Sequence, residues 1–193
     1  MVSLNNIKVG FAMTGSFCTF EAALELMERL KNSGAELTPI MSECAYSTDT
    51  RFGDAGDIIR RVEELCGREI ISSITDAEPI GPKGLIDVLL IAPCTGNTLA
   101  KLAHGVNDSA VTMAAKAHLR NGRPVLLAVS TNDGLSGSAE NIGRLLNRRN
   151  IYFLPFYQDD PVNKPRSLAS RYELAEESIL AALEGRQIQP ILG

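Results

Sequence analysis

Two short runs of uninterrupted apolar residues constrain the fold of this chain more than any other feature of its sequence. They are residues 88–92 and 125–129, each five residues long. A half-exposed strand alternates apolar and polar residues, whereas a strand covered on both faces is apolar throughout. We therefore expect both runs to be central strands of a parallel sheet with helices on both faces. Neither run approaches the roughly 20 apolar residues that a membrane-spanning helix needs.

Strand-like and helix-like segments alternate along the rest of the chain. Strands are predicted at residues 7–13, 37–41, 88–92, 125–129 and 152–156. Helices are predicted from Phe20 to the stop at Asn32-Ser33-Gly34, from Asp54 or Asp57 to Gly67, after the turn at 93–98, and over 109–119 and 168–183. Residues 42–56, 76–84 and 158–166 are polar or Pro-containing and are expected to be loops.

About five β/α repeats predict an α/β fold with a three-layer, doubly wound parallel sheet, Rossmann-like or flavodoxin-like. The 193 residues fit one core, and no internal repeat or linker is evident, so residues 1–193 are expected to form one domain. In such folds, ligands bind in the crevice at the carboxyl ends of the strands. The loops that follow the strands are therefore the places to look for a site.

Composition narrows the function classes. The net charge is −4 and aromatic residues make up 5%, with no Trp, which disfavours a nucleic-acid partner because phosphates need clustered Lys and Arg. Residues 1–20 contain one Lys and lack the pattern of a signal peptide, so a cytoplasmic protein is expected. The cysteines are more than twenty residues apart and form no Cys-x-x-Cys pair, which predicts reduced thiols and no metal site.

The first candidate site is the loop after the first predicted strand. Thr14-Gly15-Ser16 precedes a helix, where hydroxyl groups, a permissive backbone and free N–H groups suit one phosphate. The loop lacks the Lys of a nucleoside triphosphatase loop and the Gly-x-Gly-x-x-Gly of a dinucleotide site. The alternative is that Thr14 or Ser16 only caps the helix. Ser42, directly after the next strand, would face the same crevice.

The turn after the central strand at 88–92 is the most specific signal. Pro93-Cys94-Thr95-Gly96-Asn97-Thr98 is rich in hydroxyl and amide groups, and an Asn both donates to and accepts from a planar heterocycle. Cys94 at a helix N-terminus could be a reactive thiol, or it could simply pack in the core. His104 and His118 are more typical of surface or helix-end residues than of catalysts, and no catalytic residue is assigned.

The turn resembles the Pro-Ala-Ser-Ala-Asn-Thr signature of a flavoprotein fold. Cysteine decarboxylases that contain flavin, phosphopantothenoylcysteine decarboxylase and flavin prenyltransferase share this fold. Pro93, Asn97 and Thr98 match the signature, Thr95 replaces its Ser, and Cys94 and Gly96 replace its alanines. The resemblance implies bound FMN, with its phosphate near Thr14, Gly15, Ser16 and Ser42. It implies that the ring faces Pro93, Cys94, Thr95, Asn97, Thr98 and the later Asn132.

Four segments are similar, more closely, to one branch of this superfamily, the B subunits of dipicolinate synthases. They are residues 10–20, 92–98, 108–120 and 130–135. This resemblance implies a sporulating bacterium, with the protein in the cytoplasm of the mother cell, and a partner A subunit that has a dinucleotide-binding fold and carries NAD(P). The pair would oxidise a dihydropyridine dicarboxylate of the lysine pathway to dipicolinate. Homo-oligomers, often trimers or their multiples, are also implied.

The chain departs from the decarboxylase pattern at two places. It has no His ahead of the Asn-containing turn, and Ser130-Thr131-Asn132 stands where the decarboxylases have Pro-x-Met-Asn. Decarboxylation of a peptidyl cysteine is therefore not expected. Two alternatives remain open from the sequence, a non-catalytic scaffolding protein that has kept the fold, and a free-standing FMN-dependent enzyme such as a flavin prenyltransferase.

Overall fold

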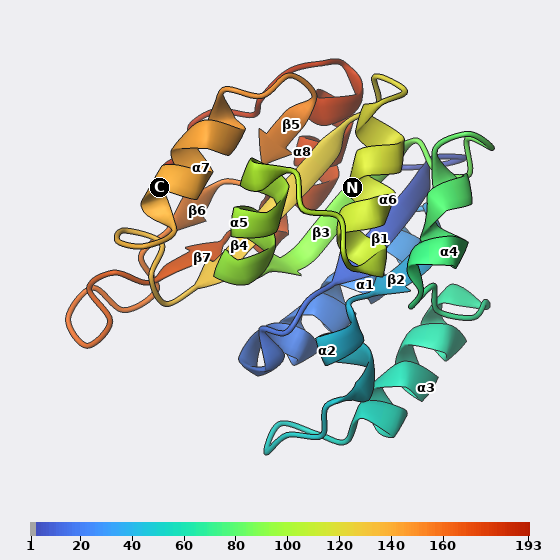
Figure 1. Ribbon diagram of the computed structural model, residues 1–193, viewed down its shortest axis with the longest axis horizontal. Coiled ribbons are helices and arrows are strands. Elements are labelled where there is room, and N and C mark those ends of the chain that lie inside the picture. The colour runs from blue at the N-terminus through green and yellow to red at the C-terminus, as the bar shows by residue number, and fades with distance from the viewer. Residues whose placement is uncertain (1–2) are drawn as a thin grey trace.

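The computed structural model describes residues 3–193 as a twisted sheet between two layers of helices (Figure 1). The strands are β1 (Lys8–Met13), β2 (Glu36–Met41), β3 (Val88–Cys94), β4 (Val125–Thr131), β5 (Ile151–Phe153), β6 (Phe156–Tyr157) and β7 (Leu168–Ser170). Their order is β2-β1-β3-β4-β7-β6, and β5 also pairs with β4. β2, β1, β3, β4 and β5 are parallel, which confirms the predicted α/β class.

Helices cover both faces of the sheet. They are α1 (Phe20–Asn32), α2 (Glu43–Ser47), α3 (Ala55–Cys66), α4 (Ile74–Ala77), α5 (Gly96–His104), α6 (Ala110–Leu119), α7 (Ala139–Leu146) and α8 (Ala175–Leu183). One core packs α1, α3 and α8 on Val88, Leu90 and their neighbours. The other packs α5, α6 and α7 on Leu89 and Ile91. The predicted central strand therefore buries side chains on both faces, as its continuous apolar run requires.

Three segments differ from the sequence prediction. Residues 42–56 contain the short helix α2, whose first turn is capped because the Ser42 hydroxyl accepts from the Ala45 N–H at 3.3 Å. Residues 76–84 contain the end of α4 and a 3-10 turn over Glu78–Ile80. The predicted helix over 168–183 begins instead as strand β7, and α8 starts only at Ala175.

The strand β7 changes the far side of the sheet. It pairs antiparallel with the end of β4, with Ser130 opposite Ala169, and β6 pairs antiparallel with β7. The strand predicted over 152–156 is split into β5 and β6, because Leu154 and Pro155 separate them and Pro cannot donate to a ladder. The hairpin loop between β6 and β7 consequently reaches back toward the carboxyl ends of the parallel strands.

Within the described part of the chain, every helix is too short or too polar to cross a membrane.

Candidate functional site

Two adjoining cavities lie where the loops after β1, β2, β3 and β4 meet. The first cavity, of about 420 Å³, is lined by Thr14, Gly15, Ser42, Thr95, Asn97 and Thr98, together with Glu43, Cys44, Lys101, Asp108 and Ser109. The second cavity, of about 250 Å³, is lined on one side by Gly15, Ser16, Gly96, Ser130, Thr131 and Asn132 and on the other by the β6–β7 segment. Gly15 and Thr95 line both cavities, so only these residues and their neighbours separate them.

The structure brings eight of the ten sequence-predicted site residues to these cavities. Thr14, Ser42, Asn97 and Thr98 line the first cavity, and Ser16 and Asn132 line the second. Gly15 and Thr95 line both. Pro93 and Cys94 line neither, because their side chains are buried within β3.

Thr14 joins the first and third loops. Its side chain is 1% exposed, and its hydroxyl donates to the Pro93 carbonyl at 2.7 Å and accepts from the Thr95 N–H at 3.1 Å. The one proton of this hydroxyl is therefore committed to the protein. Neither Thr14 nor Ser16 caps the following helix with its side chain. The Ser16 hydroxyl instead lies 2.8 Å from the Ser130 hydroxyl, and both residues line the second cavity.

Gly15 lies where the loops after β1 and β2 meet, beside the first cavity. A Cβ at this position would lie 3.1 Å from Cys44 Sγ, which is closer than most side-chain contacts. The missing side chain therefore lets the loops after β1 and β2 approach each other closely beside the first cavity. Ser42 and Cys44 face that cavity from the start of α2.

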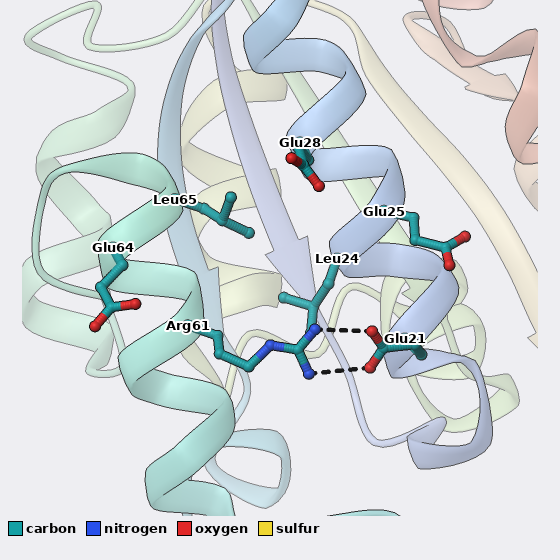
Figure 2. Close-up of a pocket in the computed structure, with 7 residues that line it drawn as sticks. All are labelled: Glu21, Leu24, Glu25, Glu28, Arg61, Glu64 and Leu65. Atoms are coloured by element: carbon teal, nitrogen blue, oxygen red, sulfur yellow. Dashed lines mark hydrogen bonds and ion pairs between the residues drawn. The ribbon is translucent and has the colours of Figure 1, made fainter.

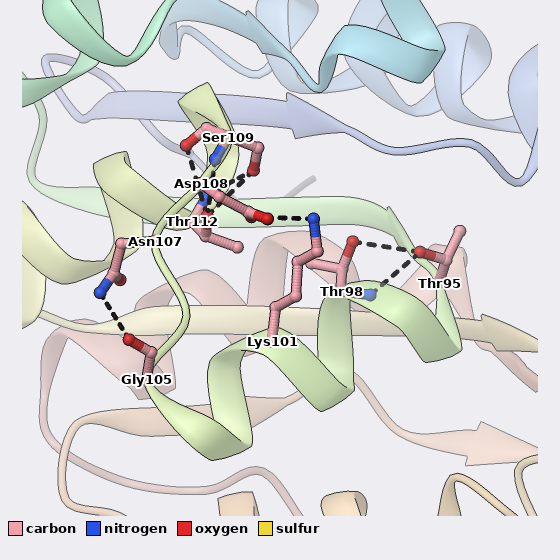
Figure 3. A network of polar contacts seen from close by, with 8 residues as sticks. All are labelled: Thr95, Thr98, Lys101, Gly105, Asn107, Asp108, Ser109 and Thr112. Carbon is pink, nitrogen blue, oxygen red and sulfur yellow. Dashed lines mark hydrogen bonds and ion pairs between the residues drawn. The ribbon is translucent and has the colours of Figure 1, made fainter.

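The far wall of the first cavity is a polar network on α5 and α6 (Figure 3). Thr95 caps α5 by accepting from the Thr98 N–H at 3.3 Å. Lys101 Nζ lies 2.8 Å from Asp108 Oδ1, and the Lys101 ammonium lowers the pKa of the Asp108 carboxyl by hydrogen bonding to it. Ser109 and Thr112 form a reciprocal capping box at the start of α6. The wall presents hydroxyl and amide groups, and the charge of its single Lys is balanced by Asp108.

Cys94 is a core residue. Its side chain is fully buried, and burial without an opposing charge raises the pKa of its thiol. The sequence left a reactive thiol and a packing thiol open, and the structure supports the packing role. Its environment is apolar, with Leu99 and Val129 in the same core.

Neither histidine lines the two cavities described above. His104 ends α5 and is exposed, as expected of a helix-end residue. His118 is fully buried, which contradicts the expectation of a surface position. It packs on the inner face of α6, among buried alanines.

A third cavity, of about 350 Å³, lies between α1 and α3 (Figure 2). Its polar lining is Glu21, Glu25, Glu28, Glu64 and one cation, Arg61, which forms two hydrogen bonds to Glu21 at 2.8 and 3.0 Å. Three carboxylates there have no ion-pair partner among residues 3–193, so the surface repels anions. Its chemistry is opposite to that of a phosphate site.

Sequence reasoning missed most of the second cavity. Ser130, Thr131, Asp159, Lys164 and Ser167 line it, and none was predicted as a site residue. The last three come from the β6–β7 segment, whose return to the site depends on the antiparallel pairing of β7. Lys101 and Asp108 were likewise not predicted as site residues, although they follow the Asn-containing turn closely.

The chain belongs to the Flavoprotein family, whose profile matches residues 2–165. It is 47% identical over 192 residues to the B subunit of dipicolinate synthase from Bacillus subtilis (strain 168), covering 100% of this chain and 96% of the relative. The crystal structure of the dipicolinate synthase B subunit from Bacillus halodurans C superposes with a TM-score of 0.90 at 46% identity, covering 99% of this chain and 98% of that one. The predicted resemblance to this group is confirmed.

A more distant structure shares the fold. The FMN-dependent cysteine decarboxylase SpaF superposes with a TM-score of 0.69 at 21% identity, covering 93% of this chain and 99% of that one. This likeness shows the flavoprotein, Rossmann-like fold.

Proposed function

We propose that this chain is the B subunit of a dipicolinate synthase and that it binds FMN in the first cavity. The observation that carries the proposal is the full-length similarity to the B subunit of the Bacillus subtilis dipicolinate synthase, at 47% identity. With an A subunit that carries NAD(P), the chain would convert a dihydropyridine dicarboxylate to the aromatic pyridine dicarboxylate in the cytoplasm of a sporulating mother cell. It would do so as a homo-oligomer that binds neither nucleic acid nor membrane.

The residues of the first cavity suit a phosphate-bearing cofactor. Gly15 lets two loops approach each other closely beside this cavity, and Ser42 offers a hydroxyl group there, whereas Ser16 lines the adjoining second cavity. Asn97, at the first turn of α5, offers a donor and an acceptor to the edge of a flavin ring. Thr14 also lines this cavity, and its hydroxyl holds the β1 and β3 loops together.

The reaction requires the substrate to lose a hydride and a proton as its ring becomes aromatic. A bound flavin supplies a two-electron acceptor, which hydroxyl and aliphatic side chains cannot. The chain's own residues would bind and orient the cofactor and the substrate. The Thr95 cap fixes the start of α5 and thereby Asn97, and Asp108 keeps Lys101 at the cavity wall. Ser16 and Ser130 hold their hydroxyls together beside the second cavity.

FMN binding is tested by incubating the purified protein with FMN, desalting it and recording the visible spectrum. We expect flavin absorbance to be retained and the unfolding temperature to rise with FMN. Asn97→Ala should weaken FMN binding by about tenfold, the loss of roughly one hydrogen-bonding group. Asn147→Ala, at the exposed end of α7, is the matched control and should bind as the wild type does. Colourless protein with no thermal shift would refute FMN binding.

A test of the proposed dipicolinate synthase activity needs the A subunit as well. Dipicolinate formation by the A subunit is measured with and without this chain. We expect formation to depend on it. Equal yields without the chain would favour the alternative of a non-catalytic scaffolding protein. Prenylated flavin formed by the chain alone from FMN and a prenyl phosphate would favour the flavin prenyltransferase.

A further inference from the structure

The second cavity has a charge arrangement that the first cavity lacks. Asp159 and Lys164 are the charged residues of its lining within residues 3–193. Lys164 Nζ lies 3.6 Å from Asp159 Oδ2, beyond hydrogen-bond distance, and the Lys164 side chain is 54% exposed. In the first cavity, by contrast, Lys101 lies 2.8 Å from Asp108. Lys164 is therefore held less closely by its ion-pair partner than Lys101 is, and its exposed ammonium group is still accessible to an anion.

The loop that carries Lys164 is ordered by its own hydrogen bonds. Asp160 Oδ1 accepts from the backbone N–H and the side-chain amide of Asn163, at 2.9 and 3.2 Å. The Lys164 N–H donates to the Asp160 carbonyl at 2.8 Å, and the Ser167 N–H donates to the Lys164 carbonyl at 3.0 Å. These bonds hold the backbone of Lys164 at the rim of the cavity, so its ammonium group stays near the cavity.

The opposite wall carries neutral donors. Ser16 and Ser130, whose hydroxyl oxygens lie 2.8 Å apart, have one proton left between them for a ligand, and Asn132 adds a side-chain amide. The Thr131 hydroxyl donates to Asp133 at 2.5 Å and is not available as a donor. A carboxylate accepts hydrogen bonds from hydroxyls and amides and pairs with an ammonium. Donors on one wall and an exposed, loosely paired cation on the other suit a small planar ring with carboxylates at its edge.

We propose that the second cavity binds the carboxylated heterocycle and that Lys164 pairs with one of its carboxylates. The identity of the ring rests on the proposed function. The two cavities share Gly15 and Thr95, so a ring here would lie beside a ligand in the first cavity, as transfer between two bound molecules requires. Asp159 competes for Lys164 and repels the same carboxylate.

The two loop residues therefore have opposite effects on affinity. Lys164→Gln removes the cation and should raise the Kd for a dicarboxylate by about tenfold or more. Asp159→Asn removes the competing charge and should lower that Kd severalfold. A purely structural role for this loop would not produce effects of opposite sign. Lys116→Gln, on the exposed side of α6, is the matched control for the loss of one positive charge and should leave the Kd unchanged.

The experiment is calorimetric titration of pyridine-2,6-dicarboxylate into the full chain, with and without FMN. We expect binding by the wild type that weakens with added salt, because the contact is an ion pair. No binding by the wild type, or equal affinity in Lys164→Gln and Lys116→Gln, would overturn the proposal. Failure of FMN binding is read separately from the spectrum, and the titration of flavin-free protein still tests Lys164.

Discussion

The buried His118 makes a quantitative prediction about acid stability. Its side chain is fully buried, and neither ring nitrogen has a hydrogen-bond partner among the described residues. Burial, and then the positive charge of Arg123, lower its pKa from 6.5 to about 4. Asp87 opposes this shift but does not outweigh it. The folded protein therefore holds His118 neutral in a pH range where the unfolded chain takes up a proton.

The direction in which stability changes with pH follows from the order of the folded and unfolded pKa values of His118. Because the folded pKa lies below the unfolded one, the contribution of His118 to stability is complete above pH 6.5 and is lost as the pH falls toward 4. At about 1.4 kcal/mol per pH unit, the full loss is about 3 kcal/mol, and about 2 kcal/mol is gone by pH 5. This is a large part of the about 5–15 kcal/mol by which domains are stable.

The assay is urea unfolding at pH 7.5, 6 and 5, compared between the wild type and His118→Leu. Leu is close to His in volume, and no hydrogen bond is lost because the ring nitrogens make none. The free energy of unfolding of the wild type should fall by about 2 kcal/mol more than that of the variant between pH 7.5 and 5. His104→Gln, at an exposed histidine, should keep the wild-type slope. Equal slopes for the wild type and His118→Leu would refute the reasoning.

Three further stability predictions concern two glycines and one buried hydroxyl group. A Cβ on Gly96 would lie 2.6 Å from Ser138 Oγ, so Gly96→Ala should lower the free energy of unfolding by about 1–3 kcal/mol. Gly143→Ala, in the open surface of α7, should raise it by about 0.5–1 kcal/mol, and urea unfolding of both variants checks the difference in sign. The buried Tyr172 hydroxyl has no partner among the described residues, so Tyr172→Phe should leave the free energy of unfolding within about 0.5 kcal/mol of the wild type or raise it. A loss above about 1 kcal/mol for Tyr172→Phe would show that its hydroxyl makes a hydrogen bond.

The strands that could be predicted are those whose burial is visible locally. Residues 88–92 and 125–129 are apolar throughout, and the structure places them at the centre of the sheet. The strand β7 has no such signal, because three residues hold too little of any period. Its pairing of Ser130 with Ala169 joins residues far apart in the chain. Antiparallel pairing of this kind is decided by tertiary packing, so local periodicity predicted a helix there.

Only the part of the candidate site that lies on loops directly after parallel strands could be predicted from the sequence. Ligands of open α/β sheets gather at the carboxyl ends of strands, and this rule led to Thr14, Ser42 and Asn97, which line one cavity. The rule names loops that directly follow parallel strands. Lys164 is on a hairpin between antiparallel strands, so the rule does not reach it.

Residue type also says less than geometry about what a side chain does. A Thr in the first loop of such a fold suggests a phosphate ligand, because its hydroxyl faces the crevice. In the structure, the Thr14 hydroxyl gives its proton to the Pro93 carbonyl and accepts from Thr95. It therefore fixes the distance between the two loops that form the cavity. A hydroxyl has one proton to donate, and the partner that takes it depends on the contact between β1 and β3, which only the folded chain creates.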